Sequence, residues 1–234
     1  MPHRQYARRL GRAAALVVGL VAAAPLHAQE RAPAGQAGAT AVAAGSPAPG
    51  ANPANTSAAP VSEETRKMVG WVMGRRDNKG MPFVIVDKRD PTAFVFDGGG
   101  HLLGATPVLL GLARGDESAP GVGDKKLADI RPDERTTPAG RFVASLGYGL
   151  GPQDILWVDY PSALALHRVL PASSREHRLQ QIASTSPQSR RVTFGCINVP
   201  TAFYDGVIRP AFIRTSGVVY ILPEIKTIAE VFSG

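Results

Sequence analysis

Hydrophobic and polar positions alternate with the short period of β-strands over most of the chain after residue 80. Runs rich in β-branched and aromatic side chains recur between turns rich in glycine, proline and charged residues. The pattern predicts strands at 82–87, 92–97, 102–110, 141–146, 155–159, 163–169 and 217–222. Several short strands with few helices indicate a mostly β domain, built as a sandwich or a barrel.

Two stretches break this pattern with a helical period. Ser62 is a residue type that caps helix N-termini, and it precedes a helix that we expect over 63–74. The apolar residues on or near one side of this helix are Met68, Val69, Trp71 and Val72. A second, short helix is expected around Tyr204, Val207 and Ile208.

Residues 1–28 have the pattern of a secretory signal. A positive stretch with Arg4, Arg8, Arg9 and Arg12 precedes an apolar run over 13–24 that is short for a membrane span. The run ends at Leu26-His27-Ala28, an acceptable cleavage site. We therefore expect export to the periplasm or the cell envelope, with no integral membrane segment left after cleavage.

The next stretch, 29–62, is rich in alanine, proline and glycine and has almost no large apolar side chains. Such a composition cannot bury enough surface to offset chain entropy, so we expect a disordered tether. The tether either lets the domain reach a distant or bulky substrate or has no function of its own. Residues 63–234 have the length of one globular domain.

The net charge of the chain bears on which classes of partner it could bind. The whole chain carries a formal charge of +7, but four of its arginines lie in the predicted signal, and the remainder is close to neutral. This balance gives no support for nucleic-acid binding. The sequence also lacks a cluster of histidine and cysteine with metal-ligand spacing and a phosphate-binding glycine loop, so we expect no metal and no cofactor.

The main candidate for a reactive residue is Cys196, the single cysteine of the chain. A lone cysteine within one chain is either inert packing or a reactive thiol. An unpaired thiol is a liability in an oxidising compartment. Gly195 before it permits unusual backbone angles, and polar Thr193 and Asn198 flank it where a buried strand would be apolar. These features favour a reactive thiol.

A nucleophilic thiol needs a basic partner, because a thiol of ordinary pKa near 8.5 is only a few per cent ionised at neutral pH. After the predicted signal the chain has His101, His167 and His177. His101 follows a glycine turn and His177 lies in a charged stretch. His167 ends an apolar run over 163–166, where it is either a satisfied core group or the base. We take His167 as the base and His177 as the reserve.

These residues resemble the catalytic signature of the L,D-transpeptidases of the YkuD type. The order is His167, then Thr193-x-Gly195-Cys196-Ile197-Asn198, with Thr136-Thr137-Pro138-Ala139-Gly140-Arg141-Phe142 upstream. The resemblance covers roughly residues 80–223 and implies a single YkuD-like β-sandwich or barrel domain with a few short helices. Phe194 replaces the histidine that usually precedes the Gly-Cys pair. His167 and Cys196 lie 29 positions apart, a long spacing that reflects an insertion over 172–190, which is either a lid or a surface excursion.

The resemblance implies a cysteine-nucleophile transpeptidase acting on peptidoglycan stem peptides. Cys196 would attack, His167 would act as base and then acid, and the Arg168 backbone carbonyl would hold the imidazole. The backbone N–H groups of Gly195 and Cys196 would stabilise the oxyanion. Thr193, Asn198 and Arg191 are the candidate substrate-binding residues.

Several alternatives stay open. The chain could hydrolyse the same bond, as an L,D-carboxypeptidase or amidase, or release proteins joined to the wall. It could also be a non-catalytic wall-binding module, for which Phe194 would be the evidence. The arginines at 190 and 191 either meet stem-peptide carboxylates or form a solvated pair at a loop end. Trp157 and Tyr160 are interpreted as core or strand-edge residues rather than as a sugar-binding surface.

Overall fold

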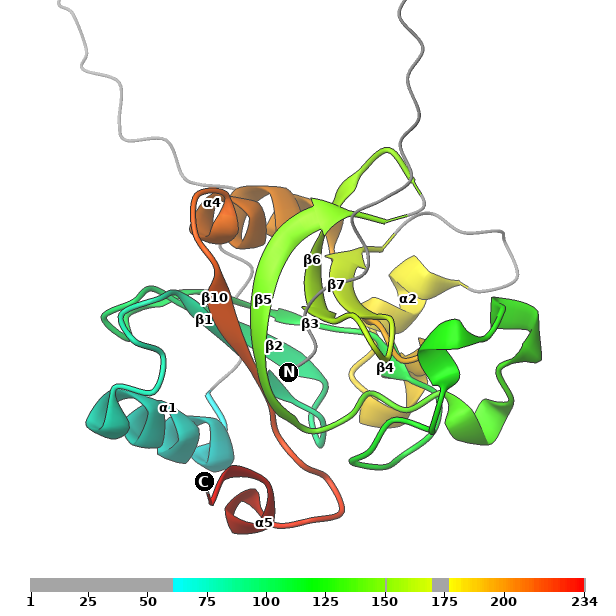
Figure 1. Cartoon of the computed structure of the whole chain (residues 1–234), viewed down its shortest axis with the longest axis horizontal. Coiled ribbons are helices and arrows are strands. Elements are labelled where there is room, and N and C mark those ends of the chain that lie inside the picture. Colours follow the sequence, from blue (N-terminus) through cyan, green and yellow to red (C-terminus); the bar gives the residue numbers. More distant parts are fainter. Residues whose placement is uncertain (1–60, 150, 170–176, 234) are drawn as a thin grey trace, which may run out of the picture. The chain divides into compact units, whose positions relative to one another are not determined.

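A computed structural model of the chain describes residues 61–149, 151–169 and 177–233 (Figure 1). The predicted signal at 1–28 lies outside the described residues. So does the predicted tether at 29–62, apart from Val61 and Ser62, and so does the 172–176 part of the insertion. The three domain boundaries therefore stay predictions.

Ten strands form two sheets. The strands are β1 (Phe83–Asp87), β2 (Thr92–Phe96), β3 (Leu102–Pro107), β4 (Leu110–Gly111), β5 (Gly140–Tyr148), β6 (Asp154–Asp159), β7 (Leu164–Arg168), β8 (Arg191–Thr193), β9 (Ile197–Val199) and β10 (Gly217–Ile221). The larger sheet has eight strands in the order β3-β2-β1-β10-β5-β6-β7-β9, and β4 pairs with β8 separately. The prediction of a mostly β fold is confirmed.

The helices are short except for the first. They are α1 (Glu63–Arg75), α2 (Arg178–Ile182), α3 (Thr201–Phe203), α4 (Arg209–Phe212) and α5 (Ile228–Phe232), with a π-helical turn η5 (Tyr204–Ile208) and 3₁₀ turns η1 (Val122–Asp124), η2 (Leu127–Asp129), η3 (Pro132–Glu134) and η4 (Pro187–Arg190). Both predicted helices are confirmed. Among the described residues, no helix has the length and apolar character needed to cross a membrane.

The larger sheet curls until its two edges nearly meet (Figure 1). Leu109 follows edge strand β3, and Asn198 lies in the opposite edge strand β9. The two residues exchange backbone hydrogen bonds, each 2.9 Å long. This bridge closes the sheet into a barrel-like shape and places Asn198 at the seam.

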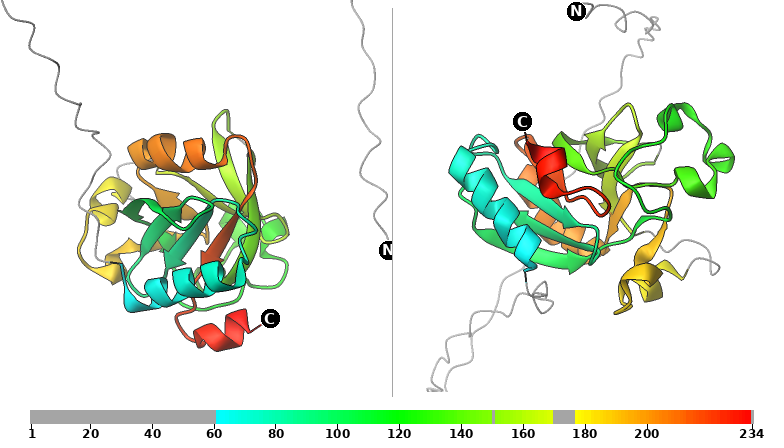
Figure 2. Two further views of the ribbon diagram at one scale, coloured as in Figure 1. Left: turned by 90° about the vertical axis from the view of Figure 1, so that its left-hand side faces the viewer. Right: turned by 90° about the horizontal axis from the view of Figure 1, so that it is seen from below.

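Strand β1 shows how the sheet supports two cores. Val84 and Val86 point into the barrel, where they join the apolar side chains of the helical segment after β9. Phe83 and Ile85 point to the other side, into a second core with Met68 of α1. Figure 2 shows α1 and α5 together on that side of the sheet. Every β1 residue is therefore buried, as a central strand covered on both faces requires.

Local chemistry explains where several elements begin and end. Ser62 caps α1, since its Oγ accepts a hydrogen bond of 3.2 Å from Thr65 N. The strand predicted over 102–110 is broken instead. It ends at Pro107, which has no N–H for a ladder, and Val108 N donates to Pro91 O outside the sheet.

Candidate active site

Cys196 sits in a tight turn between β8 and β9. Thr193 builds this turn, because its hydroxyl accepts from Gly195 N at 3.2 Å and donates to Cys196 O at 2.7 Å. Gly195 has a φ of 129°, a conformation that a side chain would strain. A Cβ there would also lie 3.0 Å from Thr136 O. The Thr-x-Gly-Cys pattern thus has a local structural reason.

A second threonine holds the turn from outside. The Thr137 hydroxyl donates to Gly195 O at 2.7 Å and accepts from Gly111 N at 2.8 Å, and the whole residue is buried. It belongs to the Thr-Pro segment that carried part of the family resemblance. The sequence pattern singled out this segment, while the contact itself links positions 58 residues apart.

The register of β7 against β9 sets the faces of the site. The two strands run parallel, with Leu166 opposite Ile197 and His167 opposite Asn198. Leu166 and Ile197 point into the barrel core. Because side chains alternate along a strand, His167 and Asn198 share the opposite face. Cys196, two residues before Asn198, begins that same face.

His167 is held at Nδ1, which lies 2.9 Å from the Arg168 carbonyl oxygen. A carbonyl can only accept, so Nδ1 carries the proton. Asn198 Nδ2 lies 2.9 Å from Nε2 and 3.2 Å from Nδ1, so the amide packs against the ring and not along the Nε2 lone pair. Burial lowers the pKa of His167, more than the Arg168 carbonyl raises it. The imidazole is therefore neutral near pH 7, as a general base must be.

The thiol rests against the adjacent turn. Cys196 is half-buried and unpaired in any disulfide, and its Sγ donates to Ala163 O at 3.5 Å. Burial raises the pKa of Cys196, while a hydrogen bond from the Ala165 backbone N–H and the charge of Arg178 lower it. Within the part of the chain that the structure describes, no hydrogen bond joins Sγ to His167. A raised thiol pKa and a lowered imidazole pKa favour a protonated resting thiol and a neutral imidazole near pH 7.

Arg178 was not anticipated from the sequence. It is the first residue of α2, in the insertion, and its Nη1 donates to Asn198 Oδ1 at 3.3 Å. This contact turns the amide so that Nδ2 faces His167. The positive charge of Arg178 also lowers the pKa of both Cys196 and His167. A part of the insertion thus contributes to the site, whereas His177, the reserve base, caps α2 and is exposed.

Arg168 has two separate duties. Its carbonyl holds the imidazole, as the resemblance implied, while its guanidinium pairs with Asp154 Oδ1 at 2.9 Å and with Asp205 Oδ1 at 2.6 Å. The guanidinium carbon also lies 4.0 Å from the centre of the Tyr204 ring. The side chain therefore anchors β7 to the helical segment, and only its backbone oxygen faces the imidazole.

The expectations for Arg190 and Arg191 need correction. Both are buried, so they do not form a solvated pair. Arg191 binds Glu224 Oε2 at 2.5 Å and the Lys88 backbone oxygen at 2.8 Å, with 1% of its side chain exposed. Arg190 donates to two backbone carbonyls, those of Ser184 and Pro91. These guanidiniums hold the chain before the cysteine turn and are already engaged there.

Phe194 fills the position where the family has histidine. Its ring lies under the guanidinium of Arg135, with the carbon 4.0 Å from the ring centre. Arg135 also donates to Ile130 O, which fixes the cation over the ring. A cation–π contact of this kind gives Phe194 a structural role.

Two cavities flank the site. A narrow one of about 20 Å³ includes Cys196, Ala163 and Phe194 in its wall. A wider one of about 410 Å³ includes His167 and Arg168 and is bounded by the loop before β6. Cys196 and His167 thus line different cavities.

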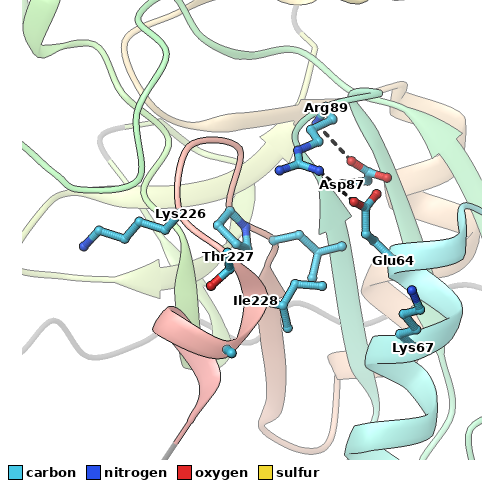
Figure 3. Close-up of a pocket in the computed structure, with 10 residues that line it drawn as sticks. Glu64, Lys67, Asp87, Arg89, Lys226, Thr227 and Ile228 are labelled. Atoms are coloured by element: carbon cyan, nitrogen blue, oxygen red, sulfur yellow. Dashed lines mark hydrogen bonds and ion pairs between the residues drawn. The ribbon is translucent and has the colours of Figure 1, made fainter.

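A third cavity, of about 360 Å³, lies elsewhere (Figure 3). It is lined by Glu64, Lys67, Asp87, Arg89, Leu222, Pro223, Lys226, Thr227, Ile228 and Ala229. Arg89 and Glu64 pair within its wall at 2.7 Å (Figure 3), while Lys67 and Lys226 pair with glutamates outside it. It contains neither the thiol nor the imidazole, so the chemistry points to the site at Cys196.

Comparison with known proteins gives a likeness of fold. No protein-family model and no curated protein matches the chain. The solved structures that resemble it are mostly L,D-transpeptidase catalytic domains, the family that the sequence resembles. They include an LD transpeptidase in complex with imipenem (16% identity, 60% of this chain and 58% of that chain, TM-score 0.34). The catalytic domain of the L,D-transpeptidase from E. faecium is similar over 61% of this chain and 98% of its own (15% identity, TM-score 0.34).

A further similar structure is the helical cell shape determining protein Pgp2 from Campylobacter jejuni (14% identity, 63% of this chain, TM-score 0.42). This chain spans 58% of the imipenem-bound protein and 49% of Pgp2. With TM-scores below 0.5, the likeness carries no argument about activity, which rests on the geometry of the site.

Proposed function

We propose that the chain is a cysteine L,D-transpeptidase that acts on tetrapeptide stems of peptidoglycan. The observation that carries the proposal is the shared face of β7 and β9. It brings together a lone thiol, a neutral imidazole held by the Arg168 carbonyl, and the Asn198 amide. A nucleophile, a base and a group that orients the base are the parts that acyl transfer needs.

The first half-reaction forms a thioester. The Cys196 thiol turns from Ala163 O toward His167 Nε2, which takes its proton. Sγ then attacks the carbonyl carbon between the third residue and the terminal D-Ala. The tetrahedral intermediate collapses, the C–N bond breaks, and His167 returns the proton to the leaving nitrogen, so free D-Ala departs.

The second half-reaction regenerates the thiol. An acceptor amine attacks the thioester carbonyl and gives a proton to His167, which passes it to the departing sulfur. The product is a new amide, as in a 3–3 crosslink. Water in place of the amine gives L,D-carboxypeptidase activity.

Backbone N–H groups would stabilise the oxyanion. Gly195 N–H already donates to Thr193 in the resting structure, so we assign the first donor role to Cys196 N–H. Such a donor is worth about 3 kcal/mol in the transition state. Thr193 keeps its expected place at the site, as the residue that shapes the turn rather than as a direct contact of the peptide.

The proposed location of the protein rests on the predicted signal. A signal over 1–28 would export the chain to the periplasm or cell envelope, where stem peptides are found. The described residues of the site require no metal or other cofactor for this chemistry. The partners are therefore the peptidoglycan stems themselves.

The test uses the full chain with purified disaccharide-tetrapeptide and mass spectrometry of the products. Wild type is expected to release D-Ala or form a dimer, whereas Cys196→Ala and His167→Gln are expected to do neither. His101→Gln is a matched control, because His101 is 82% exposed and pairs with Asp97 away from the thiol. Its activity should equal that of wild type.

The products also separate the alternatives. A crosslinked dimer identifies transfer, and D-Ala release alone identifies hydrolysis at the same bond. Binding of the substrate by wild type without any product would overturn the enzyme and leave a wall-binding module. The same mass spectrum would detect the acyl-enzyme as an adduct on Cys196.

A further inference from the structure

An aromatic pair projects from β6 near the thiol. Trp157 and Tyr160 stack with ring centres 4.3 Å apart and planes 19° from parallel. Trp157 is half-buried and Tyr160 is 67% exposed, so the tyrosine ring forms the outer layer. Tyr160 is therefore not a core residue, and it lies directly after the last residue of β6. A stacked, exposed pair of this kind has no role in either core of the barrel.

The strand register places the pair on the same face of the sheet as Cys196. Trp157 lies opposite Ala165 of β7, and Leu156 beside it points into the barrel core. Ala165 in turn donates its N–H to the thiol of Cys196. Trp157, Ala165 and Cys196 thus form a row across three neighbouring strands, in which Ala165 is buried.

The neighbouring strand is shaped to receive the indole. Gly147 of β5 has no side chain, and a Cβ there would lie 2.9 Å from Cδ1 of Trp157. The indole Nε1 donates to Tyr148 O at 3.3 Å. The indole therefore lies flat against β5 and supports the tyrosine ring. This rigid support is what a binding platform needs.

The turn after the platform reaches the thiol cavity. Tyr160 O accepts from Ala163 N at 3.0 Å, and Ala163 O accepts from the thiol. Ser162 of the same turn lines the narrow cavity beside Cys196 and hydrogen-bonds Asp159. The platform and the nucleophile are thus joined by one short turn with polar groups at its rim.

We propose that the Tyr160–Trp157 platform binds a sugar ring of the glycan strand that carries the stem peptide. Pyranose rings present flat faces of C–H groups, which pack on exposed aromatic faces, while their hydroxyls need a polar rim. The exposed ring of Tyr160 offers such a face, and Ser162 and the Tyr160 hydroxyl supply polar groups. The inference rests on the proposed function, since it takes the thiol as the site of peptide cleavage.

The platform and the thiol are separated by a distance of the order of the stem length. Neighbouring strands lie about 4.8 Å apart, so β9 is about 10 Å from β6, which carries Trp157, and about 14 Å from β5, on which the indole lies. Three residues of stem peptide join the sugar to the carbonyl that Cys196 would attack, and an extended chain of three residues spans about 10 Å.

Tryptophan fluorescence tests the platform without any need for catalysis. Replacing Trp71 by phenylalanine leaves Trp157 as the single tryptophan of the chain. Titration of this variant with an N-acetylglucosamine tetramer should give a saturable change in emission. Adding Tyr160→Ala should weaken binding at least fivefold. Tyr148→Ala is the matched control, because this exposed tyrosine has its ring outside the stack, and it should bind as the parent does.

Two results would overturn the platform. One is the lack of a saturable change up to about 10 mM sugar, well above a weak Kd of about 1 mM. The other is equal binding by the Tyr160 and Tyr148 variants when both remain folded by circular dichroism. A separate assay of D-Ala release keeps the two proposals apart. Sugar binding without D-Ala release supports the platform and opposes the transpeptidase, and the reverse result supports only the transpeptidase.

Discussion

Asn198 faces His167 across two parallel strands, and its amide Nδ2 lies 2.9 Å from the ring Nε2. This nitrogen is the one that would receive the thiol proton. In the resting structure the Asn198 amide packs against the ring, 3.2 Å from Nδ1 as well, while the thiol donates to Ala163 O. A substrate that displaces the thiol from Ala163 would leave it to turn toward the imidazole.

Replacing Asn198 by aspartate should raise the pKa of His167. A carboxylate can only accept, so it would favour the protonated ring that donates to it. Because the base must be neutral, the acidic limb of the pH–rate profile should move to higher pH. NMR titration of the His167 ring protons measures the change, with His101 as an internal control. An unchanged titration of His167 would contradict the assigned contact.

Replacing Arg178 by glutamine should slow the reaction of the thiol with iodoacetamide severalfold at neutral pH. The charge of Arg178 lowers the pKa of Cys196, so its removal leaves less thiolate at a given pH. The rate profile should move to higher pH, and Arg178→Lys should largely restore it.

Arg214→Gln is the matched control for Arg178, since it removes one positive charge from an exposed position in the turn before β10. It should react as wild type does. Identical profiles for the two glutamine variants would assign the effect to net charge and remove Arg178 from the site.

Replacing Thr137 by valine should loosen the cysteine turn. The variant leaves Gly195 O and Gly111 N without their buried partner, which typically costs about 1–3 kcal/mol of unfolding free energy. Urea unfolding measures the loss, and kcat should fall because the turn carries the nucleophile. Thr137→Ser keeps the hydroxyl and should retain most of both quantities. A stable and fully active valine variant would show that the clamp is dispensable.

Asp116 should govern part of the acid stability. Burial alone would raise its pKa, but hydrogen bonds from Lys88 Nζ and from backbone N–H groups outweigh burial and lower the pKa to about 2. Because the pKa is lower in the folded chain, Asp116 stabilises the fold at pH values above its pKa in the unfolded chain. This stabilisation is lost as the pH falls toward 2. The shift corresponds to about 2 kcal/mol.

Urea midpoints between pH 2 and 5 would measure the contribution of Asp116. Asp116→Asn should flatten this dependence. It should also destabilise the protein by about 3–5 kcal/mol near neutral pH, because Lys88 is left buried beside one fewer anion. A variant that keeps the slope of wild type would place the acid sensitivity in other carboxyl groups.

Local signals in the sequence predicted most of the fold. The α1 cap at Ser62 and the strands of the larger sheet other than β9 depend on neighbouring residues, and the structure confirms them. Strands β8 and β9 went unpredicted because each is three residues long and forms only by pairing with distant segments. The break after Pro107 could have been read from the proline alone.

The residues of the site also divide into those that local sequence signals predict and those that depend on distant contacts. Cys196, His167 and the turn-forming Thr193 stand out by residue type and spacing. Arg178 does not, because a charged helix in an insertion looks like solvated surface until Asn198 is placed beside it. The sequence suggested Arg191 as a substrate-binding residue because its partner, Glu224, comes from a distant turn and could not be identified from the sequence. Contacts of this range depend on topology, which spacing does not reveal.

The bridge between Leu109 and Asn198 has a consequence for inactivation. Two hydrogen bonds fasten the seam of the barrel at the residue that also orients the imidazole. A small opening of this edge would release Asn198 from its backbone partner while both hydrophobic cores stay intact. Activity should therefore be lost on mild heating before circular dichroism or intrinsic fluorescence changes. For this protein, circular dichroism and fluorescence spectra typical of the folded chain would not show that the catalyst is active.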